Sequence, residues 1–182
     1  MRRWVALLAL AASIGLGAEM DRCACDVARA EAMAARDCSL CREAEKQPVA
    51  EAYFFLRDNS PLKPDQWLIL PRVHTSDGRL PLSKISATER AAFWTAAVTR
   101  ARSMFGERWG LALNGDEARS QCHTHVHIGQ LREGVESGQP LVVAGPSDIP
   151  VPEDGGGMWI HAASGKIHVH LGEQGTEGVL ER

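Results

Sequence analysis

The sequence predicts an α+β domain in which an antiparallel sheet packs against one long helix. Three observations predict this fold: several short segments with strand composition, a single long segment with helical periodicity, and few stretches that could cross over between parallel strands. The 182 residues suffice for one domain, and 45% hydrophobic against 24% charged residues exclude a disordered chain.

Residues 1–18 have the features of a secretory signal peptide. Arg2 and Arg3 precede an uncharged, mostly apolar run over residues 4–17, which is short for a membrane span. Small residues end the run, so we expect cleavage near Ala18 and an exported chain, periplasmic or extracellular. An uncleaved leader is the alternative, and it is the one route by which we expect membrane attachment. Disulfides persist in an exported protein.

The charge of the chain limits its partners. Lys and Arg number 20 against 23 Asp and Glu, which gives a formal net charge of −3. We expect no nucleic-acid binding, because that function requires a basic face. Seven His and five Cys are a high share of potential metal ligands.

The N-terminal part of the chain begins with a helical segment, residues 19–37. Residues 26–37 are rich in helix formers and contain neither Gly nor Pro, which predicts one continuous helix. Residues 50–57 and 66–70 have the aromatic and aliphatic composition of strands. The loop between these strands contains Asn59 and two prolines.

The long helix is predicted over residues 87–105. Ser86 can cap its first turn and Glu89 completes a capping box, while Gly106 ends it. Apolar residues recur at steps of four, three and four along one face. These residues are Trp94, Val98, Ala101 and Phe105.

The remaining elements are strands, the last three of which lie in a C-terminal extension over residues 132–182. The predicted strands cover residues 109–114, 123–129, 141–144, 158–162 and 166–171. Ser164 and Gly165 form the turn of a hairpin between the last two strands.

A two-residue turn in this hairpin fixes which side chains share a face. It places His161 opposite His168 and Trp159 opposite His170, all on the face away from the apolar residues. The four side chains have two interpretations, a second metal- or phosphate-contacting patch and a solvated, histidine-rich edge.

Three histidines alternate along the strand predicted at residues 123–129. His123, His125 and His127 share one face, with neighbours roughly 6.5–7 Å apart along a straight strand. In a straight strand the outer two cannot easily share one metal ion, so the row suits an extended anion such as a polyphosphate better than a three-histidine metal site. A neutral imidazole is a good nucleophile toward phosphorus. A polar sheet face that is merely rich in histidine is the alternative.

The run His123-x-His125-x-His127, with apolar residues between and after, resembles the signature of the histidine-triad nucleotide hydrolases and transferases. The resemblance covers residues 38–131 and includes two strands that end in Pro-basic-x-His, followed by the long helix. Gln121 just before the triad and Ile128-Gly129-Gln130 after it are similar to the CDP-diacylglycerol pyrophosphatase branch.

This resemblance implies roles for the pocket residues. His125 would attack phosphorus to give a nucleotidyl-histidine that water hydrolyses, and His127 would contact the phosphate and the leaving group. Substrate-binding residues would be Asn114, Ser120, Gln121 and Asn59. No catalytic metal is required. With an unperturbed histidine pKa of about 6.5, we expect activity to fall as the pH drops through roughly 6.

The function implied is an exported hydrolase of nucleoside phosphoanhydride-type bonds, with a nucleotide or nucleotide conjugate as substrate. Two alternatives remain open: a nucleotidyltransferase of the same superfamily, and a zinc-stabilised nucleotide- or metal-binding protein without turnover. Members of the family commonly dimerise, which makes a homodimer possible.

Cys38 and Cys41 form a C-x-x-C motif, which alone is compatible with zinc, redox chemistry or disulfides. By the same resemblance, a structural zinc ion would be held by Cys38, Cys41, His74 and His123, linking the N-terminal helical segment to the sheet.

The rival to zinc is a pair of disulfides that involve Cys23 and Cys25. If residues 26–37 are one straight helix, Cys25 and Cys38 lie about 20 Å apart, beyond the roughly 7 Å that a disulfide allows. Cys122 points away from the triad face and is expected to be a small buried thiol.

Overall fold

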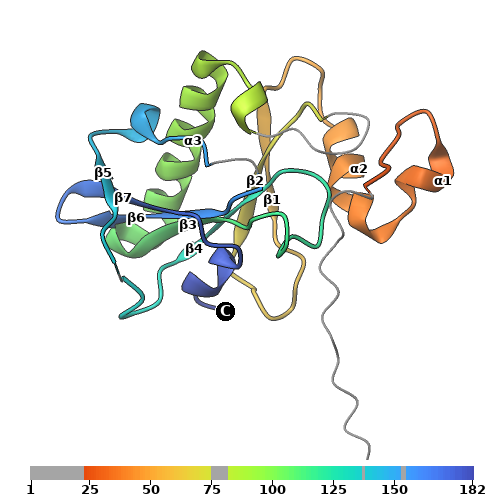
Figure 1. Cartoon of the computed structure of the whole chain (residues 1–182). Coiled ribbons are helices and arrows are strands. Elements are labelled where there is room, and N and C mark those ends of the chain that lie inside the picture. The colour runs from red at the N-terminus through yellow and green to blue at the C-terminus, as the bar shows by residue number, and fades with distance from the viewer. Residues whose placement is uncertain (1–22, 75–81, 137, 153–154) are drawn as a thin grey trace, which may run out of the picture.

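The computed structural model describes residues 23–74, 82–136, 138–152 and 155–182. The predicted signal peptide (1–18) and the first residues of the N-terminal segment lie outside the described residues. The described chain has the predicted α+β architecture, one antiparallel sheet and one long helix, as Figure 1 shows. No helix within these ranges is both long and apolar enough to cross a bilayer.

Seven strands form the sheet in the order β1-β2-β4-β3-β6-β7-β5, and every neighbouring pair is antiparallel. The strands are β1 (Tyr53–Arg57), β2 (Trp67–Pro71), β3 (Trp109–Leu113), β4 (Val126–Gln130), β5 (Leu141–Val143), β6 (Met158–Ala163) and β7 (Lys166–Leu171). Because β6 pairs with β3, the C-terminal hairpin continues the sheet that contains the histidine triad.

The long helix α3 (Ala87–Phe105) covers one face of the sheet and has the predicted limits (Figure 1). The capping box is present: the Ser86 hydroxyl accepts from the Glu89 backbone N–H, and the Glu89 carboxylate accepts from the Ser86 N–H. Trp94 is fully buried against apolar residues from β2, β3, β4, β6 and β7, which form the main core.

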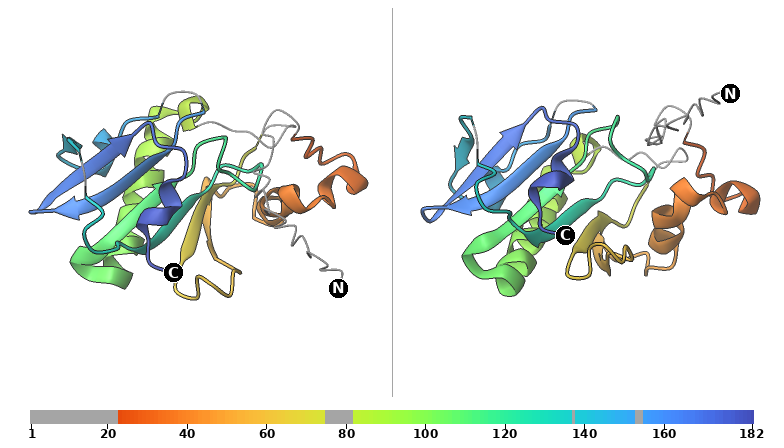
Figure 2. Two further views of the ribbon diagram at one scale, coloured as in Figure 1. Left: turned by 60° about the horizontal axis from the view of Figure 1, so that its bottom comes forward. Right: turned by 90° about the horizontal axis from the view of Figure 1, so that it is seen from below.

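The other helical pieces are short. They are α1 (Ala30–Met33), α2 (Ser39–Glu45), η2 (Arg36–Cys38), η3 (Leu82–Lys84), η4 (Gly106–Arg108), η5 (Pro146–Asp148) and η6 (Thr176–Val179), where η marks a 3-10 turn. Figure 2 shows α1 and α2 beside the β1–β2 end of the sheet and the β6–β7 hairpin at the opposite end. Ala44 of α2 packs on Phe54 and Leu68, on the sheet face that α3 leaves open.

The prediction of one helix over residues 26–37 was wrong. The side chain of Asp26 accepts the backbone N–H of Ala28 at 2.9 Å, which forms a turn, and α1 that follows has only four residues. The chain therefore folds back, and Cys25 reaches Cys38 with a Cα–Cα separation of 5.5 Å. Helix propensity could not show this, because the constraint is a covalent bond between the two ends of the segment.

Cys122 is not a free thiol, contrary to expectation. It forms a disulfide with Cys23, with 5.8 Å between the Cα atoms and a sequence separation of 99. The bond joins the N-terminal segment to the loop that enters β4.

The predicted strand over residues 123–129 begins only at Val126. His123 and His125 lie in irregular chain, where the Nδ1 atoms of both rings approach main-chain oxygens. The backbone N–H of Cys122, just before them, donates to Asp37 O of the N-terminal segment at 2.8 Å. The three imidazoles therefore do not form a straight row.

The C-terminal hairpin has the predicted register. His161 pairs with His168 and Trp159 with His170. Ser164 and Gly165 both have positive φ, 50° and 76°, as a two-residue turn between right-twisted strands requires.

Candidate active site

A pocket of about 710 Å³ lies on the sheet face opposite α3. Its walls come from α2, the β1–β2 loop, the loop before β4, and η6. His125 and His127 line it, and so do all four predicted substrate-binding residues, Asn114, Ser120, Gln121 and Asn59. The structure therefore brings these side chains together, whereas His123 is fully buried and does not line the pocket.

His125 is held in one orientation. Its Nδ1 lies 2.7 Å from the main-chain oxygen of His123, so Nδ1 carries the proton and donates it to that carbonyl. Nε2 is then the nitrogen with the free lone pair. Burial, and next the neighbouring charge of His127, lower the pKa of His125 to about 3. The His125 ring therefore stays neutral far below pH 6.

His127 lies between two carboxylates. Its Nε2 is 3.4 Å from Glu177 Oε2, and its Nδ1 is 3.7 Å from Asp58 Oδ2. The ring also contacts His125, with 5.0 Å between the ring centroids. Two negative groups around one imidazole stabilise a positive charge on it, which suits a residue that gives a proton to a leaving group.

Both carboxylates are ionised at neutral pH. Burial alone would raise their pKa values, but His127 and Lys63 outweigh it, with help from the Ser60 N–H for Asp58 and from Asn114 for Glu177, so each pKa lies below its usual value. Lys63 forms an ion pair with Glu177 and lies 3.9 Å from Asp58. The ammonium partly neutralises the acidic groups, which makes the pocket less repulsive to a phosphate.

Sequence reasoning missed Asp58, Lys63 and Glu177. Asp58 and Lys63 lie in the β1–β2 loop, where polar residues are common for reasons of turn geometry. Glu177 belongs to η6, far from the triad in sequence, and no local pattern marks it.

Asn114 holds Glu177 in place. Its Oδ1 accepts the Glu177 backbone N–H at 2.9 Å and the Thr176 hydroxyl at 3.3 Å, and its Nδ2 donates to Glu177 Oε2 at 3.3 Å. The amide expected to bind substrate is thus engaged with the neighbouring carboxylate.

Two glycines let η6 approach the sheet. Gly110 on β3 pairs with Gly129 on β4. A Cβ atom on Gly110 would lie 2.6 Å from a side-chain atom of Leu180, and a Cβ atom on Gly129 would lie 3.2 Å from another. Leu180 is buried there against Ala112 and Trp159. The small residues in the sheet thereby position the segment that supplies Glu177.

The N-terminal segment holds the loop before β4. The Ser39 hydroxyl donates to Gln121 Oε1 at 2.7 Å, and Gln121 Nε2 donates to the main-chain oxygen of Arg36 at 3.2 Å. The Cys23–Cys122 disulfide reinforces these contacts. Segments about 80–100 residues apart thus form one wall of the pocket.

The predicted four-ligand zinc set is not assembled, which corrects that expectation for this oxidised form. Cys38 is bound to Cys25, and the thiol of Cys41 is buried, which raises its pKa to about 12. The rings of His74 and His123 do meet, with centroids 5.3 Å apart. Burial lowers the pKa of His123 to about 4.

Other groups of residues could hold a metal ion. Among the described residues, two sets outside the disulfides have ligand atoms within 4.8 Å of one another. They are Asp58, His127 and Glu177 in the pocket, and Glu136, His161 and His170 at the C-terminal hairpin.

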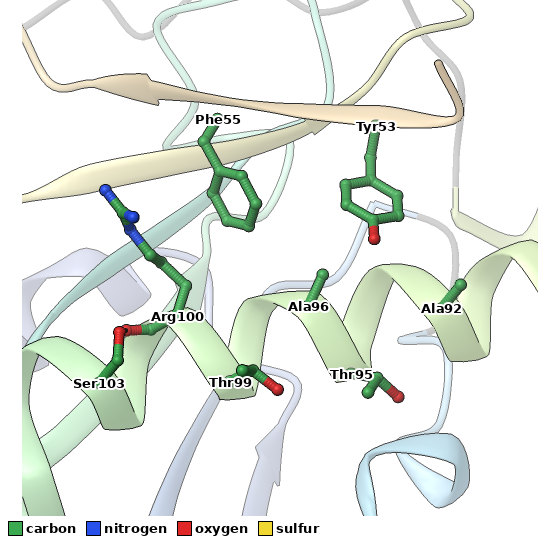
Figure 3. A pocket seen from close by; sticks show the side chains of 8 residues that line it. All are labelled: Tyr53, Phe55, Ala92, Thr95, Ala96, Thr99, Arg100 and Ser103. Atoms are coloured by element: carbon green, nitrogen blue, oxygen red, sulfur yellow. Dashed lines mark hydrogen bonds between the residues drawn. The ribbon is translucent and has the colours of Figure 1, made fainter. Parts of the chain in front are cut away.

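A second hollow, of about 580 Å³, lies between β1 and α3 (Figure 3). Tyr53 and Phe55 point into it from β1, and the Arg100 guanidinium lies 4.3 Å from the Trp67 ring centroid. It contains no pair of acid and base groups, so the histidine pocket is the better candidate for chemistry.

No protein-family model matches the chain, and no curated protein sequence matches it.

Proposed function

We propose that the chain is an exported hydrolase of nucleoside phosphoanhydride-type bonds, similar to histidine-triad enzymes, with His125 as the nucleophile. The observation that carries the proposal is the state of His125: a neutral ring, fixed through Nδ1, that lines a pocket beside His127. The two disulfides agree with export, because an oxidising compartment preserves them.

The reaction has two balanced steps. In the first, the lone pair of His125 Nε2 forms a bond to phosphorus while the bond to the leaving oxygen breaks, and His127 donates its Nε2 proton to that oxygen. In the second, a water oxygen attacks phosphorus, the N–P bond breaks, and His127 takes the proton of the water. Asp58 and Glu177 stabilise the protonated form of His127 before the first step and after the second.

The rim of the pocket supplies binding groups. Ser120 lines the pocket and would contact phosphate oxygens, and Asn59 would approach the nucleotide from the β1–β2 loop. The Gln121 amide is engaged with Ser39 and Arg36 and acts as a positioning residue for this wall. Asn114 is a positioning residue, because its amide is engaged with Glu177. This chemistry uses imidazoles and hydrogen-bond donors and requires no catalytic metal.

Kinetics with a panel of nucleoside di- and triphosphates and nucleotide conjugates test the function. We expect His125→Ala to lose turnover by several orders of magnitude and to keep its fold by circular dichroism. Ser103→Ala, on the exposed side of α3, is the control and should behave as wild type. Nucleotide binding without turnover in the wild-type chain would favour the binding-protein alternative. Product transfer to an added acceptor would favour the transferase.

Zinc bound by the two cysteines of the C-x-x-C motif with His74 and His123 would require a reduced form of the chain. Release of Cys38 from Cys25 would make two thiols available to His74 and His123, whose rings already meet. In the oxidised form the Cys23–Cys122 disulfide ties the N-terminal segment to the loop before β4 in place of zinc, and Cys25–Cys38 closes the segment on itself.

A further inference from the structure

The C-terminal hairpin brings three imidazoles and a carboxylate together outside the active-site pocket. His161 on β6 and His168 and His170 on β7 share the sheet face opposite α3, and Glu136 approaches them from the β4–β5 connection. His170 on β7 pairs with Trp159 on β6, which pairs with Ala112 on β3. Ala112 in turn pairs with His127 on β4. His127 is thus three strands, about 14 Å, away, so this cluster is separate from the triad.

The spacing of the nitrogen atoms suits a metal ion. His161 Nε2 and His170 Nε2 are 3.3 Å apart. Two imidazoles on a tetrahedral zinc ion, with Zn–N of about 2.0–2.1 Å, have their nitrogens roughly 3.3–3.4 Å apart. Glu136 Oε1 lies 3.7 Å from His161 Nε2 and 2.6 Å from His168 Nδ1. Since the Glu136 side chain is 45% exposed, small movements can bring its oxygen to the ion.

The surroundings prepare the two buried rings as ligands. His161 Nδ1 donates to the main-chain oxygen of Ala162 at 3.0 Å, which leaves the lone pair on Nε2. Trp159 stacks on His170 with ring centroids 3.6 Å apart and planes 3° apart, and its indole N–H donates to Glu173.

The rival metal cluster in the pocket is less suited to an ion. Asp58 and Glu177 already share the Lys63 ammonium, and a divalent cation would have to displace it. At the hairpin, the ion pairs of Glu136 within the part of the chain that the structure describes are with His161 and His168, so no ammonium has to be displaced there.

We propose that His161, His170 and Glu136 form a binding site for a divalent transition metal, Zn²⁺ above all, with His168 orienting the Glu136 carboxylate through their 2.6 Å contact. Two imidazoles and one carboxylate match the ligand chemistry of zinc, and a water molecule would complete a tetrahedral site. The ion would fix the β4–β5 connection to the hairpin, which is a structural role independent of the proposed hydrolysis.

Calorimetric titration of Zn²⁺ into the chelator-treated mature protein, made without a histidine tag and kept oxidised, tests the site. We expect one ion per chain and a rise in melting temperature, with affinity lower by about tenfold or more in His161→Ala and in His170→Ala. Lys166→Ala, an exposed change in the same hairpin, and His125→Ala, in the pocket, should bind as wild type.

A readout in the wild-type chain covers the case in which a hairpin variant fails to fold. Addition of Zn²⁺ should shift the imidazole ¹⁵N resonances of His161, His168 and His170. Absence of these shifts, absence of binding by the wild-type chain, or equal binding by wild type and both folded variants would each overturn the proposal.

Discussion

His127 Nε2 lies 3.4 Å from Glu177 Oε2, although the two residues come from β4 and from a 3-10 turn 50 residues later. The contact exists because Asn114 holds the Glu177 carboxylate and because two glycines let the following Leu180 approach the sheet. A residue outside the resemblance to histidine-triad enzymes thus borders the imidazole that we propose as proton donor.

We therefore expect Glu177→Gln to lower kcat by about tenfold, because the neutral amide no longer stabilises the protonated imidazole. Steady-state kinetics of the variant and of the wild-type chain measure this effect. Glu181→Gln, an exposed change in the same terminal segment, is the matched control.

The Cys23–Cys122 disulfide should contribute substantially to stability. A cross-link over about 100 residues removes chain entropy worth about 4–5 kcal/mol from the unfolded state. We expect the double variant Cys23→Ser/Cys122→Ser to lose much of that free energy of unfolding in urea titrations, and to bind substrate more weakly because the pocket loop is released. The Cys25–Cys38 disulfide closes a shorter loop, so its removal in the variant Cys25→Ser/Cys38→Ser should lower the free energy of unfolding by about 3 kcal/mol. A larger loss from the shorter loop would contradict this order.

Thiol counting distinguishes the oxidised form from the zinc form. The mature chain, purified without reductant and then denatured, should show one free thiol, that of Cys41. Before denaturation this thiol should react slowly, because burial raises its pKa to about 12. Several reactive thiols together with a zinc ion that remains in the His161→Ala and His170→Ala variants would instead place zinc at Cys38, Cys41, His74 and His123.

Stability should decrease as the pH falls from about 6.5 toward 5. In this range the unfolded chain binds protons on His123 and His125, whereas the folded chain does not until about pH 4 and about pH 3. The free energy of unfolding therefore falls with decreasing pH, by up to about 1.4 kcal/mol per pH unit for each such histidine. Denaturant titrations at several pH values measure the slope, which should be smaller in His125→Asn. A stability that does not change between these pH values would refute the neutral state of the two rings.

Local signals predicted the elements that depend on local physics. Ser86 and Glu89 fixed the start of α3, and the Ser164-Gly165 turn fixed the pairing of His161 with His168. The helix expected over residues 26–37 was wrong because a disulfide between its ends outweighs helix propensity.

The candidate site was predictable only in part, because contacts between segments far apart in the sequence complete it. The triad and its neighbouring polar residues were visible as a motif, and they do line one pocket. Glu177 reaches that pocket through pairing and packing over more than 60 residues, as its bond to Asn114 shows, and no short pattern encodes such a contact.

The most direct test of the account is to trap the covalent intermediate. The wild-type chain is mixed with a nucleotide labelled in its α-phosphate, quenched within one turnover in alkali, where a phosphorus–nitrogen bond to histidine survives, and digested for mass spectrometry. We predict the nucleotidyl group on His125, absent from His125→Ala. Turnover without any labelled histidine, or the same label in His125→Ala, would contradict the account.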